Sequence, residues 1–369
     1  MKTDKQTLVL SGEDLARITN RVGIDQLMDR MISRLEEALT QFSTSIYAVP
    51  VRGGFHYRSP RPGLIEWMPS YRLGKSIAMK MVGYHPQNPS VCGLPTILSS
   101  LSLFDASTGH LCLVADGNFL TALRTAAASA IASRRMAIAD SHTLGLIGTG
   151  AQAISQLHAL TRCFPIETVL LFDTNRSVSE SFAARLAGLG LQNVNLRVCN
   201  VSDVVSKSEI LCVATSVGIN EGPVFSGQLP HLPYLHINAV GSDLPGKTEL
   251  PLPLLQQSTV IPDFREQAIH EGESQQLEAH EIGPDLPVLL KNPGLLPHVR
   301  ESLSVFDSTG FALEDLITTE MIFELATELK IGTSVEIESS ASDPHNPYEF
   351  LNLSSEIPQP AHREYPAIT

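Results

Sequence analysis

The sequence predicts an α/β protein with two parts: a Rossmann-type, doubly wound parallel sheet domain and an α+β domain beside it. Three observations point to this fold. A glycine turn, Gly148-Thr149-Gly150, separates an apolar run from a helix-compatible segment. From residue 142 onward strand and helix patterns alternate, which is typical of a parallel sheet covered by helices. Between 46 and 115, short apolar runs are broken by Gly and Pro, as in an antiparallel or mixed sheet.

The first part begins with helices. Ser11 with Asp14 forms a helix-start pattern, and an apolar stripe from Leu27 to Leu39 marks the next helix. An alanine-rich helix over 121–140, capped by Thr121, is expected to join the two parts. The strands expected between these helices are 46–51, 64–68, 77–82, 97–104 and 111–115. We assign residues 1–128, with a C-terminal segment 331–369, to this α+β domain.

The second part, residues 129–330, is expected to form the parallel sheet. An amphipathic helix over 179–189 falls between two of its strands, and a last helix over 312–330 leaves the sheet. Prolines crowd the tail after Asp343, which predicts an extended or disordered end. The expected strands are 143–147, 168–172, 194–198, 209–214, 234–240, 258–262 and 303–306.

The glycine turn has the layout that places backbone N–H groups and a helix N-terminus against a dinucleotide pyrophosphate. Gly148 permits the tight turn, Gly150 permits close approach to the phosphates and Ala153 fills the third, small-residue position. The next strand ends in Asp173, whose carboxylate can hold ribose hydroxyls. The alternative is an ordinary Gly-rich turn without a ligand. Asp173 favours NAD over NADP because it repels a 2′-phosphate, whereas Arg176 favours the opposite.

The composition of the 369-residue chain limits the classes of partner. A formal net charge of -13 repels phosphate backbones and anionic lipid, so neither nucleic acid nor a membrane is an expected partner. The N-terminus lacks the apolar core of a signal peptide, and no apolar run approaches the ~20 residues of a membrane span. Five scattered cysteines predict buried thiols in a reducing cytoplasm. His231 and His236 have a spacing that suits a metal poorly, so no metal is expected.

Asp243 and Lys247 follow the expected strand 234–240. Ligands of doubly wound sheets lie outside the carboxyl ends of the strands, so both side chains are expected to face a cofactor. A carboxylate there can accept and donate a proton for an amine or hydroxyl that loses its α-hydride. The alternative is a purely structural turn, since Gly and Pro also shape this loop.

Three cations of the first part have apolar surroundings: Arg52, Lys80 and Arg124. Because Lys and Arg are rarely buried without a partner, an anionic ligand group such as an α-carboxylate is one interpretation. The alternatives are an internal acid or an exposed edge. Glu66, within an apolar strand, either binds a distal ammonium group or faces solvent.

Two further segments carry polar patterns. The charged run 265–274 is expected to be a solvated face. The turn within 304–310 follows a strand and is rich in Ser, Thr and Gly. It either hydrogen-bonds a nicotinamide carboxamide or caps a helix that starts near Phe311.

Eight short segments, spread from residue 64 to residue 316, form a specific set. They are LIEWMP (64–69), KMVGYHPQNP (80–89), GLPT (93–96), TALRTAAASA (121–130), LIGTGAQA (146–153), HINAVGSDLPGKTEL (236–250), EGESQQL (271–277) and VFDSTGFALEDL (305–316). As a set they resemble the ornithine cyclodeaminase/mu-crystallin family over essentially the whole chain up to the tail. Segments 51–69, 141–160 and 303–316 are most similar to bacterial lysine cyclodeaminases. Ornithine cyclodeaminases have Gly-Gly-Asp where this chain has Gly241-Ser242-Asp243.

The resemblance implies roles for individual residues. Arg52 and Lys80 would grip the substrate carboxylate, with Arg124 nearby. Asp243 would exchange the proton, and Glu66 would steer the distal amine. The family's dimers form through the sheet of the first domain, so this domain is expected to bind substrate and to form a homodimer. The residues implied to touch NAD are Thr96, Arg124, Gly148, Thr149, Gly150, Ala151, Gln152, Asp173, Thr215, Asn238, Ala239, Val240, Gly241, Lys247 and Ser308.

The implied reaction is a redox-neutral conversion of L-lysine to L-pipecolate and ammonia. NAD takes the α-hydride, the distal amine attacks the imine carbon, ammonia leaves and the hydride returns to the cyclic imine. Holding the substrate folded favours ring closure. The alternatives are the same reaction on L-ornithine, giving L-proline, a net amino-acid dehydrogenase or ketimine reductase, and a non-catalytic nucleotide-binding protein of the crystallin kind.

Overall fold

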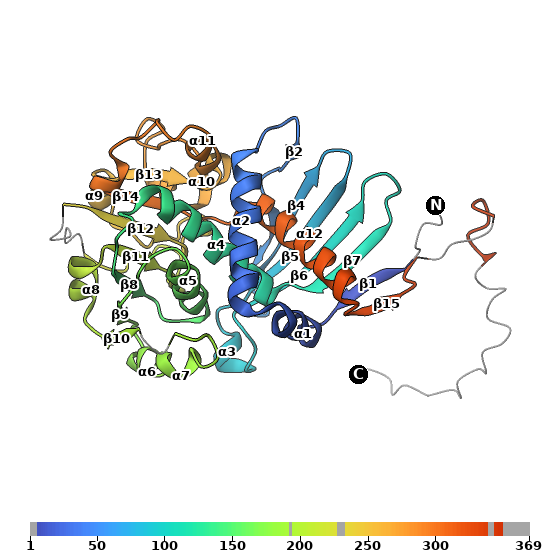
Figure 1. Cartoon of the computed structure of the whole chain (residues 1–369), viewed down its shortest axis with the longest axis horizontal. Helices are drawn as coiled ribbons and strands as arrows, with labels where there is room; N and C mark the ends of the chain where they lie inside the picture. The colour runs from blue at the N-terminus through green and yellow to red at the C-terminus, as the bar shows by residue number, and fades with distance from the viewer. Residues whose placement is uncertain (1–5, 192–193, 227–232, 339–342, 350–369) are drawn as a thin grey trace.

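The computed structural model contains two sheets that lie side by side with helices between them (Figure 1). It describes residues 6–191, 194–226, 233–338 and 343–349. The first sheet has the order β15-β1-β7-β6-β5-β4-β2, with β3 paired to β4. Its strands are β1 (Thr7–Leu10), β2 (Tyr47–Ala48), β3 (Gly53–Tyr57), β4 (Gly63–Arg72), β5 (Ser76–Tyr84), β6 (Ile97–Asp105), β7 (Leu111–Asp116) and β15 (Thr333–Val335).

The second sheet has the order β10-β9-β8-β11-β12-β14-β13, and all of its strand pairs are parallel. Its strands are β8 (Thr143–Ile147), β9 (Thr168–Phe172), β10 (Asn195–Val198), β11 (Ile210–Val213), β12 (Leu235–Ala239), β13 (Thr259–Pro262) and β14 (Leu303–Asp307). The order reverses between β8 and β11, which is the switch point where doubly wound sheets bind ligands. The predicted α/β fold with a Rossmann-type sheet is therefore confirmed. Each predicted strand of this sheet is present, with ends shifted by at most one residue.

The helices are distributed over both sheets (Figure 1). Those near the first sheet are α1 (Gly12–Val22), α2 (Ile24–Thr40), α3 (Asn88–Val91), α4 (Asn118–Met136) and α12 (Ala312–Leu329). Those around the second sheet are α5 (Ala151–Thr161), α6 (Arg176–Glu180), α7 (Phe182–Arg185), α8 (Val201–Lys207), α9 (Leu252–Leu255), α10 (Arg265–Glu271), α11 (Leu286–Lys291) and the 3-10 turns η1 (Glu273–Gln276) and η2 (Val299–Glu301).

The first sheet differs from its prediction at its edges. The expected strand 46–51 is reduced to the two residues of β2, while β1 and β3 were not predicted. Strand β1 pairs parallel with β7 and antiparallel with β15, which lies more than 300 residues away in the chain. Strand β1 depends on partners distant in sequence, so no local pattern reveals it.

Two helix starts test the capping predictions. The side chain of Ser11 accepts a hydrogen bond from the Asp14 amide, and the Ser11 amide donates to the Asp14 carboxylate, so the predicted start of α1 is confirmed. The prediction that Thr121 caps the alanine-rich helix is wrong. Helix α4 begins three residues earlier, after Gly117, and the Thr121 amide donates to the Gly117 carbonyl within the first turn.

Helix α4 contacts α2 and β6 on one side and α5, β12 and β14 on the other, as expected of a joining helix. Helix α12 leaves the second sheet, as predicted, and packs on β4, β5 and β6 of the first. The predicted helix 179–189 is instead divided into α6 and α7. Because α4 contacts both sheets, the division of the chain at 128/129 and 330/331 stays a prediction.

All five cysteines are free thiols. The prediction of burial holds fully for Cys212, whereas Cys92 is exposed and the others are half-buried. Within the described ranges, no helix combines the length and apolar character needed to cross a membrane. Most of the tail that was expected to be extended or disordered lies outside the described residues.

Candidate active site

A cavity of about 880 Å³ lies between the two sheets, at the carboxyl ends of β8, β11 and β12. Its other walls are the inner faces of β4 and β5 and one side of α4. The volume is in the upper part of the ~300–1,000 Å³ range of ligand pockets. The sequence-predicted residues that line it are Arg52, Glu66, Lys80, Thr96, Arg124, Gly148, Gly150, Ala151, Gln152, Asp173, Thr215, Val240, Gly241, Asp243, Lys247 and Ser308.

The glycine turn Gly148-Thr149-Gly150 lies at one end of this cavity. Gly148 has φ +83°, and a Cβ there would lie 2.5 Å from the Ala214 carbonyl oxygen, so only glycine fits between β8 and β11. Gly150 is the N-cap of α5, and a Cβ there would meet no atom within 4 Å. The N-terminus of α5 therefore faces open space at the point where a pyrophosphate is expected.

Asp173 lies at the end of β9 and lines the same end of the cavity. Its carboxylate accepts hydrogen bonds of 2.9 Å from the amides of Thr149 and Asn175. Arg176, the residue that argued for a 2′-phosphate, is exposed and forms an ion pair of 2.7 Å with Glu180. Thr149 itself is fully buried beneath the turn and does not line the cavity.

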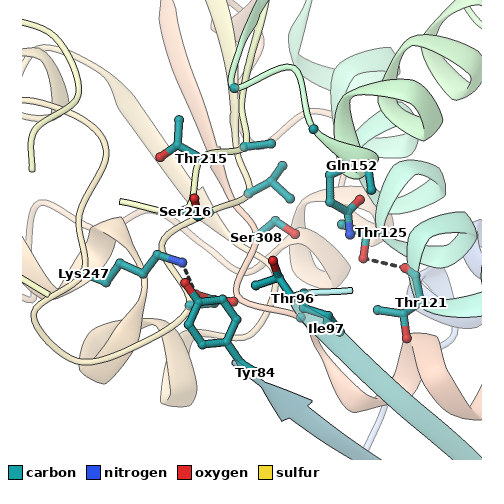
Figure 2. Close-up of a pocket in the computed structure, with 18 of the residues that line it drawn as sticks. Tyr84, Thr96, Ile97, Thr121, Thr125, Gln152, Thr215, Ser216, Lys247 and Ser308 are labelled. Atoms are coloured by element: carbon teal, nitrogen blue, oxygen red, sulfur yellow. Dashed lines mark hydrogen bonds and ion pairs between the residues drawn. The ribbon is translucent and has the colours of Figure 1, made fainter. Parts of the chain in front are cut away.

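The loop after β12 brings Asp243 and Lys247 together. The Lys247 ammonium donates to Asp243 Oδ1 at 2.8 Å and lies 5.1 Å from the centre of the Tyr84 ring (Figure 2). Although Lys247 is almost fully buried, Asp243 and Tyr84 raise its pKa above the ordinary value, against the lowering effect of burial. Lys247 therefore stays charged and holds one oxygen of Asp243.

Two residues of the predicted cofactor segment point elsewhere. The Asn238 amide donates to Ser133 Oγ at 2.9 Å, and the Ala239 carbonyl accepts from the Ser308 amide at 2.9 Å. Neither Asn238 nor Ala239 lines the cavity. They connect β12 to α4 and β14, and contact of these residues with a cofactor stays a prediction.

Arg52 is buried between two acids at the opposite end of the cavity. Its guanidinium lies 2.8 Å from Glu271 and 3.4 Å from Glu66, and it donates to the Thr309 carbonyl. Burial raises the pKa of Glu271 to about 8 against the lowering effect of Arg52, with a further contribution from Glu66. Glu66 also accepts from His56 at 3.2 Å, so it faces inward rather than toward solvent.

Lys80 and Arg124 share the acids of α12. The Lys80 ammonium lies 2.9 Å from Asp315, which also lies 3.1 Å from Arg124. Arg124 lies 2.6 Å from Glu314. Burial, together with the neighbouring Arg124, lowers the pKa of Lys80 to about 8. The predicted cations are therefore buried with internal acids, and they also line the cavity.

Ser308 is the strongest local indication of a ligand. It is buried, yet its hydroxyl has no hydrogen-bond partner among the described residues. Figure 2 shows it between Lys247 and Gln152, facing the cavity. It does not cap α12, whose N-cap is Phe311 and which lacks a side-chain cap. An orphaned hydroxyl here, with the open helix terminus at Gly150, fits a dinucleotide whose carboxamide would accept or donate at Ser308.

The prediction that 265–274 is a solvated face holds for the exposed residues Glu266, Ile269 and His270 and is wrong for 271–274. Glu271, Glu273 and Ser274 are all buried, because the segment folds back under the ends of β12 and β14. The sequence reasoning also missed Glu314 and Asp315, although two acids inside an otherwise apolar helix signal buried cationic partners. Asp307 was missed as well, and its place at the carboxyl end of a parallel strand was the available signal.

The parallel sheet with its glycine turn, and the charged cavity between it and the second sheet, define a Rossmann-type dinucleotide-binding protein. The chain belongs to the ornithine cyclodeaminase/mu-crystallin family, whose model matches residues 13–330. It is 40% identical over 346 residues to an L-lysine cyclodeaminase of Streptomyces rapamycinicus, which covers 94% of this chain and 100% of that protein.

Solved structures agree with this assignment. A lysine cyclodeaminase, whose structure concerns the recognition of L-lysine, L-ornithine and L-2,4-diaminobutyric acid, has a TM-score of 0.89 and 45% identity. The match covers 93% of this chain and 99% of that one. An archaeal alanine dehydrogenase dimer with bound NAD has a TM-score of 0.76 and 26% identity, covering 90% of this chain and 100% of that one.

Proposed function

We propose that the protein is an L-lysine cyclodeaminase that converts L-lysine to L-pipecolate and ammonia. The observation that carries the proposal is a single cavity in which the glycine turn at one end faces Arg52, Lys80 and Asp243 at the other. The similarity to L-lysine cyclodeaminases at 40% and 45% identity supports lysine over other diamino acids. The same reaction on L-ornithine remains the second candidate, because one methylene in a pocket is worth only ~1–3 kcal/mol.

The proposed cofactor is NAD, which when bound accepts a hydride from the substrate Cα and returns it to the cyclic imine. The residues that would hold it are the amides at the start of α5, Asp173 and the Ser308 hydroxyl. The NAD-bound alanine dehydrogenase dimer, of similar fold, supports this choice. Asp173 supports NAD rather than NADP, since Arg176 is engaged by Glu180.

The substrate carboxylate would bind at Arg52, Lys80 and Arg124. Their internal acids leave this group of cations nearly neutral, which suits a substrate that carries two ammonium groups and one carboxylate. Glu66, buried beside Arg52, would face the distal amine. The two sheets flank the cavity and limit the access of water that would hydrolyse an imine to a keto acid.

Asp243 would hold and release the proton. Lys247 occupies its Oδ1, and its Oδ2 has no hydrogen-bond partner in the part of the chain that the structure describes. That oxygen can accept a proton from the α-amine as the hydride leaves, and donate it when ammonia departs. The distal amine must be uncharged to attack the imine. Because Asp243 holds the proton of the α-amine at that stage, the distal ammonium would lose its proton to water.

We also propose a cytoplasmic homodimer that forms through the outer face of the first sheet. Side chains on this face are apolar and exposed, with Phe55 at 69%, Ile65 at 41% and Met81 at 39% exposure. The alternate residues of β4, such as Leu64 and Met68, point to the other face of the sheet and are buried beneath the cavity and α12. The five free thiols support a reducing compartment. Light scattering of the wild-type chain and of Phe55→Glu tests the dimer, and a monomeric wild type would refute it.

The test of the function supplies the purified chain with a catalytic amount of NAD+ and either L-lysine or L-ornithine. Ammonia and L-pipecolate should accumulate without net NADH. Stoichiometric NADH would instead indicate an amino-acid dehydrogenase. Absence of turnover on both diamino acids would refute the proposal and favour a non-catalytic nucleotide-binding protein.

A further inference from the structure

Four carboxylates that no ion pair neutralises lie under the cavity, next to Ser308 and the loop after β12. Each is at most 1% exposed, and no cation lies within ion-pair distance of any of them in the described ranges. The four acids are Glu249, Asp263, Glu273 and Asp307, which come from different segments. Backbone amides join Glu249, Glu273 and Asp307 in series.

The series ends at the two loops that line the cavity. Glu249 accepts from the Thr215 amide at 2.6 Å and from the Gly241 amide at 2.7 Å. Glu273 in turn accepts from the Glu249 amide at 2.7 Å, and Asp307 accepts from the Glu273 amide at 2.8 Å. Glu249 therefore fixes the ends of β11 and β12 against each other, at the half of the sheet opposite Asp173.

These hydrogen bonds favour the charged form of the acids. In Glu249 and Asp307 both carboxylate oxygens accept backbone N–H groups, and Asp307 also accepts from the Ser274 hydroxyl at 2.6 Å. Burial acts in the opposite direction, raising the pKa of Glu249 and raising that of Asp307 to about 7 against the effect of Ser274. Above neutral pH Asp307 therefore contributes negative charge under the cavity, and the two amides that donate to Glu249 favour its charged form as well.

The orphaned Ser308 hydroxyl is an independent sign that a ligand lies over these charges. Ser308 follows Asp307 directly and lines the cavity beside Gly241 and Thr215. Asp173 is at the far half of the sheet, where the adenosine ribose is expected, so the nicotinamide falls on the side of Ser308. A nicotinamide ring there is a cation when oxidised and neutral when reduced.

We propose that the buried carboxylates of Glu249 and Asp307 bias the site toward oxidised NAD+ over NADH. The inference rests on the dinucleotide site proposed above. Negative charge under the ring stabilises the cationic form alone, so the bound couple becomes more reducing than the free one. In the redox-neutral cycle the cofactor accepts a hydride and later returns it. The bias toward NAD+ favours the return of the hydride to the cyclic imine, and it leaves the resting protein with NAD+.

The test measures the dissociation constants of NAD+ and NADH separately on the full chain, at a pH well above 7, for wild type, Glu249→Gln and Asp307→Asn. We expect each variant to raise the ratio of the NAD+ constant to the NADH constant on the order of tenfold. A tenfold change in this ratio corresponds to about 30 mV in the potential of the bound two-electron couple. If Glu249→Gln does not fold, Asp307→Asn, which does not touch the loops of Thr215 and Gly241, carries the test.

A matched control lies at the other end of the same sheet. Glu209 accepts from the amides of His142 and Thr143 at 2.7 and 2.8 Å, so it joins the starts of β8 and β11 as Glu249 joins the ends of β11 and β12. Glu209→Gln should leave the ratio unchanged. Equal weakening of both forms in the Glu249 and Asp307 variants would overturn the inference and leave only a structural role. Failure of the wild type to bind either form would refute the dinucleotide proposal as well.

Discussion

The two ends of the cavity are built from different materials. The dinucleotide end is formed by backbone amides and glycines. Gly148 avoids a clash with the Ala214 carbonyl, and Gly150 leaves the N-terminus of α5 accessible. At the substrate end the wall consists of long charged side chains, and each cation is already bound to an acid from a distant segment. Arg52 is held by Glu271, for example, more than 200 residues along the chain.

The difference teaches how each end tolerates change. A site formed by backbone groups depends on the backbone conformation, so it loses affinity when a new side chain displaces the backbone. A site of paired charges depends on each buried cation having an acidic partner. It is destabilised when one member of a pair is removed and the other stays buried without a partner. The effects of substitutions at the two ends should therefore differ in mechanism as well as in magnitude.

The largest expected effect is at the substrate end. Asp243→Asn should keep the dinucleotide affinity but lower turnover about 10²–10⁴-fold, because the amide cannot take the proton from the amine. Steady-state ammonia release and NAD+ titration measure the two quantities. Full activity in this variant would remove Asp243 from the mechanism, and equal loss of binding and turnover would make its role structural.

The next effect concerns charge balance. Asp315→Ala leaves Lys80 and Arg124 buried without a shared acid, and we expect the free energy of unfolding to fall by about 3–5 kcal/mol. Urea unfolding measures this loss. The control is Glu180→Ala, which removes the exposed partner of Arg176 and should cost no more than about 1 kcal/mol. Similar losses in both variants would show that the paired charges contribute little to the fold.

The two ends also differ in how far the sequence predicts them. The glycine turn, Asp173 and the parallel strands are predicted from local patterns, because the turn type and the apolar runs depend on residues adjacent in sequence. The three cations of the substrate end were expected as well, from their apolar surroundings.

Their partners were not predicted, because pairing depends on the tertiary fold. Lys80 meets Asp315 across 235 residues. The segment containing Glu271 and Glu273 was expected to face solvent, because charge in sequence normally indicates exposure. It is buried because the groups that pair with these acids come from distant segments: Arg52 for Glu271, and the amides of Glu249 and Leu250 for Glu273. No local pattern carries that information.

The dinucleotide end provides the third prediction. Gly148→Ala combines a positive φ with a Cβ 2.5 Å from the Ala214 carbonyl, and we expect a loss of about 2–4 kcal/mol together with weaker NAD+ binding. The control is Gly188→Ala, which has φ +92° but meets no atom within 4 Å. It should cost about 1–2 kcal/mol, the backbone strain alone, with unchanged binding. Calorimetry and NAD+ titration check both, and equal effects would mean that the close approach of β8 to β11 is not what requires glycine.

The last prediction is a dependence of stability on pH at the substrate end. Burial raises the pKa of Glu314 to about 8, against the lowering effect of Arg124, compared with an ordinary value of 4.5. The folded chain therefore binds this proton more tightly than the unfolded chain does. The stability that Glu314 contributes is present below pH 4.5 and is lost as the pH rises through about 8. Urea midpoints across that interval should fall more steeply for wild type than for Glu314→Gln, which cannot titrate, while Glu180→Gln should follow wild type. Parallel slopes for all three chains would mean that Arg124 keeps Glu314 ionised throughout, and the balance at this end would then be one of fixed charges.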